Sequence, residues 1–469
     1  MVKNDVVRLQ TLELKNIKNV LSGKIEMPKT YKKVLTDQGG EVLGIYGQNG
    51  SGKTAVIDTL YYLQQIMIGQ SIKRDMRDYI GTEAGEAEIN VNFAVFQSEI
   101  IYEVGYHIII QKSQGEDGVQ LLRETLSCAK HEGDARSNKA VFMDYNRNEP
   151  DSIFTPKKRL EELCDADKEN RTDLIVARKM AEKSNCSYIF GENSKEIFGR
   201  VQKGAFVDYA NIIYALFQFA LMDLFVIRNS HSGMISANFV LPMAFRIDTE
   251  TKSSVKGDFA VSLFEPTVLN KKRKDVLVQI IEEINTVLYT IIPGLKIGIH
   301  DSGIQLADDG TQECMIELLS EREGRGPIPI RMESEGIIKI ISILNALIQA
   351  FGNPSICLAI DELDAGIYEY MLGELLDIFS KSAKGQMVFT SHNLRALEML
   401  NKESIMFSTA NPNNRYIHMK NIKNSNNLRD QYIRSITLGG QNEVIYSETD
   451  SLKIARAFRK AGRSVENAR

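Results

Sequence analysis

The segment that most constrains the fold of this chain is residues 47–54, which read Gly-Gln-Asn-Gly-Ser-Gly-Lys-Thr. They fit the pattern G-x-x-x-x-G-K-[ST] of a phosphate-binding loop, or P-loop. The apolar run Val42–Tyr46 before the loop predicts a buried strand, and Ala55–Leu63 after it predicts a helix. This context makes the pattern credible, because the glycines let the backbone wrap a polyphosphate and the helix N-terminus faces the anion.

Every residue of the loop is a candidate nucleotide ligand. The predicted nucleotide-binding residues of the loop are Gly47, Gln48, Asn49, Gly50, Ser51, Gly52, Lys53 and Thr54. Lys53 is expected to supply positive charge to the β- and γ-phosphates, and the Thr54 hydroxyl is placed for Mg²⁺.

A second part of the expected site lies about three hundred residues later. Residues 355–360 form an apolar run that predicts a buried parallel strand, and Asp361 and Glu362 follow it. Ligand groups in open α/β sheets lie at the carboxyl ends of such strands. Asp361 is therefore expected to hold Mg²⁺, and Glu362 is expected to polarise an attacking water.

Three further segments contain candidate residues for contacts to the phosphates or to a second subunit. His392 ends another apolar run and is a candidate contact for the γ-phosphate, or simply a polar residue at a strand end. Asp364 lies in a short turn suited to a subunit contact. Ser334 and Gly336 begin an apolar helix and either contact a phosphate or form an ordinary helix cap.

In this order, the segments resemble the ABC-type ATPase head of SMC, RecF and OLD proteins. The resemblance implies an α/β fold, a P-loop head whose mixed sheet is flanked by helices, with a mostly helical inserted domain. It also implies ATP and Mg²⁺ as ligands, and a homo-oligomer in which Ser334, Gly336 and Asp364 complete the ATP site of a second subunit. Residues 12–20 look like the first strand and turn of such a head.

The chain is most similar to compact ATPases of bacterial anti-phage defence, the AriA subunits of PARIS systems. Met332–Gly336, Ile360–Gly366 and Phe389–Leu394 carry that resemblance, which covers residues 1–110 and about 270–450. It implies a cytoplasmic sensor or scaffold that holds a separate Toprim-type nuclease and releases it when a phage-encoded trigger protein appears. The alternative is a RecF- or SMC-like repair ATPase that clamps DNA, and a transporter head is a weaker third.

Three regions are expected from the positions of the motifs. They are residues 1–125, the N-terminal half of the head; 126–265, a mostly helical insertion at an oligomer or partner interface; and 266–469, the C-terminal half of the head. In the first region, Glu86–Phe96 and Ile100–Gln111 predict two strands. Gln97 in the turn between them is either a Mg²⁺-sensing glutamine or a plain polar turn residue.

Composition limits the partners. The formal net charge is −4, so no global basic field attracts nucleic acid, and any nucleic-acid contact would need a local basic patch. The apolar segment Ile212–Ile227 contains Gln218 and Asp223 and is short for a bilayer, so we expect a buried helix and no membrane span.

Overall fold

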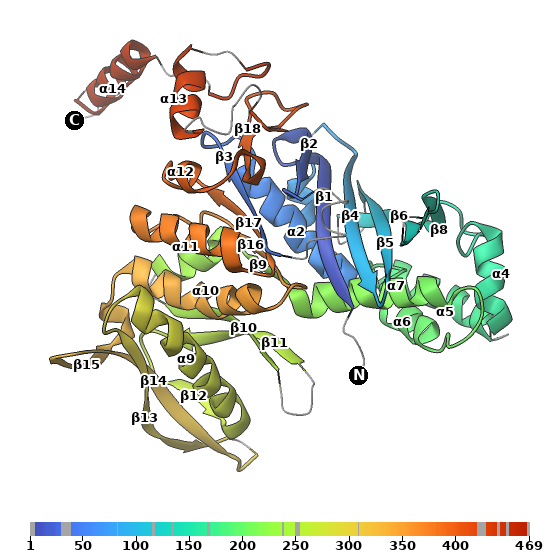
Figure 1. Cartoon of the computed structure of the whole chain (residues 1–469), viewed down its shortest axis with the longest axis horizontal. Helices are drawn as coiled ribbons and strands as arrows, with labels where there is room; N and C mark the ends of the chain where they lie inside the picture. The colour runs from blue at the N-terminus through green and yellow to red at the C-terminus, as the bar shows by residue number, and fades with distance from the viewer. Residues whose placement is uncertain are drawn as a thin grey trace.

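The computed structural model describes residues 5–29, 39–81, 83–114, 118–133, 135–166, 169–236, 239–248, 254–307, 309–419, 428–438, 441–446 and 450–466. Figure 1 shows two large sheets side by side with the long helix α2 (Lys53–Met67) between them. A smaller sheet and its helix lie at the lower end, and a group of helices lies at the lower right.

The central sheet has six strands in the order β19–β18–β3–β17–β16–β9, and all but β19 run parallel. Its strands are β3 (Glu41–Tyr46), β9 (Leu224–Ile227), β16 (Cys357–Ile360), β17 (Gln386–Ser391), β18 (Ile405–Ser408) and β19 (Tyr416–Ile417). Strands β3, β16, β17 and β18 are buried at every position, as expected when helices or sheets cover both faces. Their parallel register brings the carboxyl ends of β3, β16 and β17 to one edge.

The second large sheet is antiparallel, with the order β2–β1–β4–β5–β6–β7 and β8 beside β6. Its strands are β1 (Val6–Ile17), β2 (Val20–Glu26), β4 (Glu86–Gln97), β5 (Ile100–Lys112), β6 (Val119–Glu132), β7 (Ala135–Arg136) and β8 (Ala140–Asn146). The two strands predicted on either side of the turn at Gln97 are confirmed as β4 and β5. Helix α2 contacts both β1 and β16, so its apolar residues are buried on nearly all sides.

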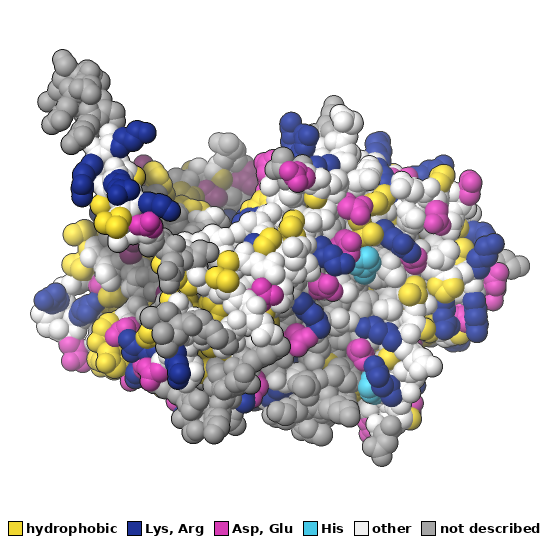
Figure 2. Space-filling view, turned by 90° about the horizontal axis from the view of Figure 1, so that it is seen from above, with side chains coloured by type: hydrophobic (Ala, Val, Ile, Leu, Met, Phe, Trp, Pro, Cys, Tyr) yellow, Lys and Arg dark blue, Asp and Glu magenta, His cyan; other side chains and the backbone are white. Residues whose placement is uncertain are grey.

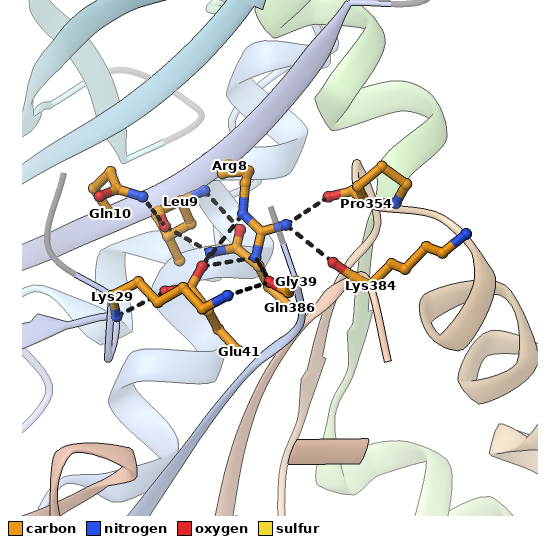
Figure 3. A network of polar contacts seen from close by, with 9 residues as sticks. All are labelled: Arg8, Leu9, Gln10, Lys29, Gly39, Glu41, Pro354, Lys384 and Gln386. Carbon is orange, nitrogen blue, oxygen red and sulfur yellow. Dashed lines mark hydrogen bonds and ion pairs between the residues drawn. The ribbon is translucent and has the colours of Figure 1, made fainter. Parts of the chain in front are cut away.

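A buried polar network joins the two sheets at the end of β3 that is opposite the P-loop. Arg8 of β1 and Glu41 of β3 form an ion pair of 2.7 Å, and both side chains are fully buried. The Gln386 amide of β17 donates to the Glu41 carboxylate at 2.9 Å and accepts from the Leu9 backbone N–H at 2.8 Å. Figure 3 shows these contacts converging between the sheets. Removing one partner of such a pair costs about 3–5 kcal/mol, so the network locks the relative position of the sheets.

The region after β8 is mainly helical. Its helices are α4 (Lys157–Ala166), α5 (Asn170–Ser184), α6 (Glu192–Gly199), α7 (Val207–Gln218) and α8 (Asn229–Ser236). A hairpin of β10 (Val240–Asp248) and β11 (Ser254–Ser262) follows. Strand β6 runs across the predicted boundary at residue 125, and β9, which lies well inside the predicted insertion, joins the central sheet. The strands of the two large sheets therefore extend into residues 126–265.

The prediction of one buried helix over Ile212–Ile227 is wrong in its second half. Helix α7 ends at Gln218, a π-helical turn covers Phe219–Asp223, and β9 begins at Leu224. A short apolar run has no periodicity that separates a buried strand from a buried helix. Asp223, which is costly in an apolar helix, instead pairs with Arg246 of β10 at the point where the chain enters the sheet.

The smaller sheet precedes the Asp361 strand in the chain. It contains β12 (Thr267–Asn270), β13 (Lys296–Leu306), β14 (Gln312–Arg322) and β15 (Arg325–Pro329). Helix α9 (Lys271–Ile291) packs against β12, β13 and β14.

The remaining helices cover the central sheet or follow it. They are α3 (Met76–Tyr79), α10 (Glu335–Gly352), α11 (Glu369–Ser382), α12 (Ala396–Met399), α13 (Leu428–Leu438) and α14 (Ser451–Glu466). Among the described residues, α10 alone is long and apolar enough to cross a membrane, and 67% of it is buried by the rest of the chain. The predicted fold class, α/β with a mixed sheet flanked by helices, is confirmed.

Candidate functional site

The P-loop adopts the conformation that its glycines allow. Gly50 and Gly52 have φ angles of 76° and 89°, in the left-handed region that favours glycine. Gly52 is the N-cap of α2, so Lys53 and Thr54 form the first turn of that helix. The N–H groups of a first helical turn and the positive end of the helix dipole suit an anion such as a phosphate.

Strands from late in the sequence support the loop. The Tyr416 hydroxyl donates to the Gly52 carbonyl at 2.6 Å, and the Ser408 hydroxyl lies 2.5 Å from that of Ser51. A Cβ on Gly47 would lie 1.9 Å from the Ser408 hydroxyl oxygen. Close packing against β18 and a φ angle of 153° together favour glycine at position 47.

Lys53 lies at the centre of the loop. Its ammonium donates to the carbonyls of Gly47 at 2.9 Å and Gln48 at 3.1 Å. Burial lowers the pKa of Lys53, and the negative charges of Asp361, Glu362 and Asp364 oppose this effect. A buried cation facing carboxylates across a small gap is a suitable environment for a phosphate with its metal ion.

Asp361 lies where a metal ligand is expected. One carboxylate oxygen accepts from Thr390 at 2.6 Å and lies 3.3 Å from the Thr54 hydroxyl. The other oxygen is buried and has no hydrogen-bond partner among the described residues. A buried carboxylate oxygen without a partner is costly unless something binds it. The oxygen donors of Thr54 and Asp361 therefore fit a hard divalent cation such as Mg²⁺.

Glu362 has an unusual backbone conformation. Its φ is 49°, which is strained for a residue with a Cβ. Two contacts hold it: its N–H donates to the Thr390 hydroxyl at 2.8 Å, and the Lys339 ammonium donates to its carbonyl. Neither Thr390 nor Lys339 was predicted as a site residue. Thr390 lies within the Phe389–Leu394 segment but was given no role, and Lys339 lies outside the three segments that carry the resemblance, so tertiary packing alone reveals both contacts.

Asp364 and His392 lie on the same side of the site. An Asp364 carboxylate oxygen accepts from the His392 backbone N–H at 3.0 Å, and its other oxygen is buried without a partner among the described residues. Partial desolvation and the nearby Lys53 cation lower the pKa of His392, against the raising effect of the three carboxylates. The imidazole is therefore neutral at pH 7 and able to accept a hydrogen bond.

These residues surround one open pocket of about 210 Å³. Its lining includes Asn49, Gly50, Gly52, Lys53, Thr54, Glu362, Thr390 and His392. Lys18 and Asn19, from the turn between β1 and β2, also line it. That turn was recognised in the sequence, but neither side chain was given a role there. A larger hollow of about 1090 Å³ lies between the 148–154 loop, α4 and α5, and none of the predicted site residues lines it.

Ser334 and Gly336 both have intrachain contacts. Ser334 is the N-cap of α10 and accepts from the Ile337 backbone N–H at 3.4 Å. A Cβ on Gly336 would lie 1.9 Å from the Gly366 carbonyl oxygen, so α10 begins in close contact with the turn after Glu362. The cap and the close packing account for both residue types within one chain. The Ser334 side chain is nevertheless exposed, at a helix start, beside the Glu362–Gly366 turn.

Gln97 is not brought to this site. Its amide donates to Asp5 at 2.8 Å, and Asp5 lies beside Ser355, whose hydroxyl is 3.5 Å from its carbonyl. Ser355 precedes the amino end of β16, whereas Asp361 follows its carboxyl end. Gln97 therefore lies at the opposite edge of the central sheet from the P-loop. The structure places Gln97 at the last position of β4, opposite Ile100 of β5, so the turn itself is Ser98 and Glu99 and Gln97 is a polar residue at a strand end.

No protein-family model matches the sequence, and no curated protein matches it. Among solved structures the chain is similar to Smc head domains. The Pyrococcus furiosus head with an extended coiled coil, bound to the C-terminal domain of ScpA, has 14% identity and a TM-score of 0.39 over 88% of this chain and 96% of that one. The Pyrococcus yayanosii head with a coiled coil and joint has 12% identity and a TM-score of 0.40 over 92% and 100% of the two chains.

The Thermotoga maritima SMC head has 13% identity and a TM-score of 0.34 over 88% of this chain and 99% of that one. Because these identities and TM-scores are low, this similarity carries no argument about function.

Proposed function

We propose that this chain binds ATP with Mg²⁺ at the Gly47–Thr54 loop and hydrolyses it to ADP and phosphate. One observation carries the proposal. The Thr54 hydroxyl lies 3.3 Å from Asp361, whose second oxygen is buried and unpartnered among the described residues, beside the buried Lys53. Thr54 and Asp361 would hold the metal ion, which when bound neutralises phosphate charge.

The loop, Glu362 and His392 have separate proposed roles in phosphate binding and hydrolysis. The loop N–H groups and Lys53 bind the phosphate oxygens. The Glu362 carboxylate accepts a proton from the attacking water, and its strained backbone is held in place by Thr390 and Lys339. Neutral His392 accepts a hydrogen bond at the mouth of the pocket, close to Asp364.

The experiment is a calorimetric titration of the full chain with ATP and Mg²⁺, followed by a phosphate-release assay. Lys53→Ala is expected to abolish measurable binding, because the only cation in the centre of the described loop is lost. Lys381→Ala is the matched control, since Lys381 is an exposed lysine on α11. Equal ATP binding by wild type and Lys53→Ala would refute the proposal.

The proposed working unit is a homo-oligomer in which two heads enclose ATP. Two features support this: the pocket is open, with His392 exposed at its mouth, and the exposed Ser334 lies next to the turn that carries Asp364. Ser334 and the N-terminus of α10 would reach the nucleotide of the second subunit, while Gly336 keeps α10 against its own Gly366.

More specifically, we propose that this chain is a cytoplasmic sensor or scaffold of anti-phage defence and that it holds a separate Toprim-type nuclease. The support is the resemblance of Met332–Gly336, Ile360–Gly366 and Phe389–Leu394 to the ATPases of PARIS systems. These three segments are in mutual contact, through Gly336 with Gly366 and Asp364 with His392. Binding of ATP would favour one assembly, and hydrolysis would remove that preference.

The defence function is tested by co-purification of the tagged chain from its native operon. The wild-type chain is compared with the Glu362→Gln variant. The expected result is a nuclease that elutes with the tagged chain. If the chain elutes alone and binds duplex DNA tightly in an ATP-dependent way at physiological salt, the repair function replaces the defence function.

A further inference from the structure

Charge is distributed differently on the surface of the molecule and in its candidate site. Lys and Arg side chains are interspersed with Asp and Glu over most of the face shown in Figure 2. Inside the site the charge is concentrated, and the Lys53 ammonium faces three acidic residues, Asp361, Glu362 and Asp364. The side chain of Thr390, which is fully buried, forms hydrogen bonds with two of these three residues.

Thr390 and Asp361 lie on the same face of the central sheet. Successive residues of a strand point to opposite faces, so residues two apart share a face. Val388 of β17 and Ala359 of β16 both pack in the apolar core around α2. Thr390 and Asp361 come two residues after them and continue that face, which brings both side chains towards Thr54 at the start of α2.

The partners of the Thr390 hydroxyl fix the direction of its two hydrogen bonds. A backbone N–H can only donate, so the hydroxyl accepts from the Glu362 N–H at 2.8 Å. A carboxylate can only accept, so the hydroxyl donates its single proton to Oδ1 of Asp361 at 2.6 Å. Oδ2 of Asp361 is then left buried and without a partner among the described residues.

We propose that Thr390 is a positioning residue that aligns the metal ligand and the proposed base together. Its bond to Oδ1 fixes the orientation of the Asp361 carboxylate and leaves Oδ2 for the divalent cation. A partner that orients a metal ligand in this way raises the affinity for the metal. Its bond to the Glu362 N–H helps to hold that residue at a φ of 49°. This inference rests on the proposed binding and hydrolysis of ATP with Mg²⁺.

The test compares nucleotide binding with and without the metal ion. The full chain is titrated calorimetrically with β,γ-imido-ATP, which is not hydrolysed, once in Mg²⁺ and once in EDTA. The ratio of the two dissociation constants measures how much the metal ion tightens binding. Thr390→Val keeps the β-branched shape of threonine but lacks the hydroxyl. It is expected to reduce the ratio about tenfold or more and to change the affinity in EDTA by about twofold at most.

Two further variants control for the loss of a buried hydroxyl. Thr390→Ser keeps both the donor and the acceptor, so it should retain the wild-type ratio. Thr59→Val removes a hydroxyl that is also buried but donates to the Ala55 carbonyl within α2. It should likewise retain the wild-type ratio. Far-UV circular dichroism verifies that each variant is folded.

Turnover in excess Mg²⁺ separates the two contacts of Thr390. A high concentration of the metal ion fills a weakened metal site but does not restore the hydrogen bond to Glu362. When ATP and Mg²⁺ both saturate, kcat of Thr390→Val is therefore expected to stay about fivefold to tenfold below that of the wild type. Thr390→Ser should keep most of the wild-type kcat.

Each half of the proposal has an outcome that overturns it. An unchanged ratio in Thr390→Val, or a wild-type chain that binds the analogue equally in Mg²⁺ and EDTA, overturns the role at Asp361. Affinity that falls equally in Mg²⁺ and EDTA shows a merely structural role. A kcat that excess Mg²⁺ returns to the wild-type value overturns the role at Glu362.

The proposed function stands in all of these cases, because the wild-type chain still binds the nucleotide. A wild-type chain that binds no β,γ-imido-ATP under either condition would instead refute the proposed function, and this inference with it.

Discussion

The Lys339 ammonium donates a hydrogen bond to the backbone carbonyl of Glu362. Lys339 lies one turn into α10, is nearly fully buried, and faces the carboxylates of Asp361, Glu362 and Asp364. Desolvation lowers the pKa of Lys339, and those carboxylates counteract the effect. Helix α10, through Lys339, thus helps to hold the backbone of Glu362, the proposed catalytic residue, in its left-handed conformation.

Replacing Lys339 is expected to slow turnover more than it weakens binding. Lys339→Met removes the hydrogen bond to Glu362 but keeps most of the side-chain volume. A charged hydrogen bond of about 1.5–3 kcal/mol corresponds to roughly a 10- to 100-fold lower kcat. The dissociation constant for ATP should change by about twofold at most, because Lys339 does not line the pocket.

Steady-state kinetics measure kcat, and calorimetric titration measures the dissociation constant for ATP. The control variant is Lys381→Met. An unchanged kcat would remove Lys339 from this positioning role.

Glu362→Gln is expected to bind ATP and stop hydrolysis. The amide keeps the shape and the backbone contacts of Glu362 but cannot accept the proton of water. Loss of a general base costs on the order of 10²–10⁴ in rate. Single-turnover phosphate release measures the effect. If Glu362→Gln turns over at the wild-type rate, Asp364 becomes the candidate base.

Two inactive variants are expected to complement each other. Lys53→Ala removes phosphate binding on one chain, and Ser334→Arg blocks the exposed start of α10 on the other. If dimers exchange subunits, the mixture should recover about one working site per dimer, since each site draws on both chains. Turnover is measured against the mixing ratio. A chain that hydrolyses ATP at a specific rate independent of protein concentration, as a monomer, contradicts the shared site.

Gly336→Ala is expected to destabilise the protein, whereas Gly352→Ala is not. A Cβ at Gly336 would lie 1.9 Å from the Gly366 backbone oxygen, so α10 must move away from the turn after Glu362. Gly352 ends the same helix and has open space around it. Overpacking of this kind costs about 1–3 kcal/mol, and Gly→Ala in an open helical position is neutral or gains up to about 1 kcal/mol. Urea unfolding of both variants gives the comparison; equal stabilities would show that the Gly336–Gly366 contact is unimportant.

A pH profile of turnover should respond to His392. Its pKa lies below the ordinary value, so the imidazole is neutral at pH 7 and gains a proton only as the pH falls below about 6.5. If neutral His392 accepts a hydrogen bond during turnover, kcat should fall on the acid side of this range. His392→Gln should lower kcat and remove this acid limb. An acid limb that persists unchanged in His392→Gln assigns it to another group.

The sequence by itself determined the local parts of this site. The loop 47–54, the Asp361–Glu362 strand end and the His392 strand end were predicted because short motifs and apolar runs report local geometry. Strands β4 and β5 followed from the pattern of their residues. Each of these features depends on residues that are neighbours in the chain.

The tertiary structure determined which distant residues contact these local parts of the site. Thr390 hydrogen-bonds Asp361 and Glu362, and Lys339 hydrogen-bonds Glu362. Ser408 packs closely against Gly47. The members of each pair are far apart in the sequence. The tertiary structure also placed Leu224–Ile227 in the sheet and Gln97 at its far edge, because an apolar run and a polar turn carry no information about which strand lies beside them. Strand order and helix docking depend on packing between distant segments, so only the folded chain determines them.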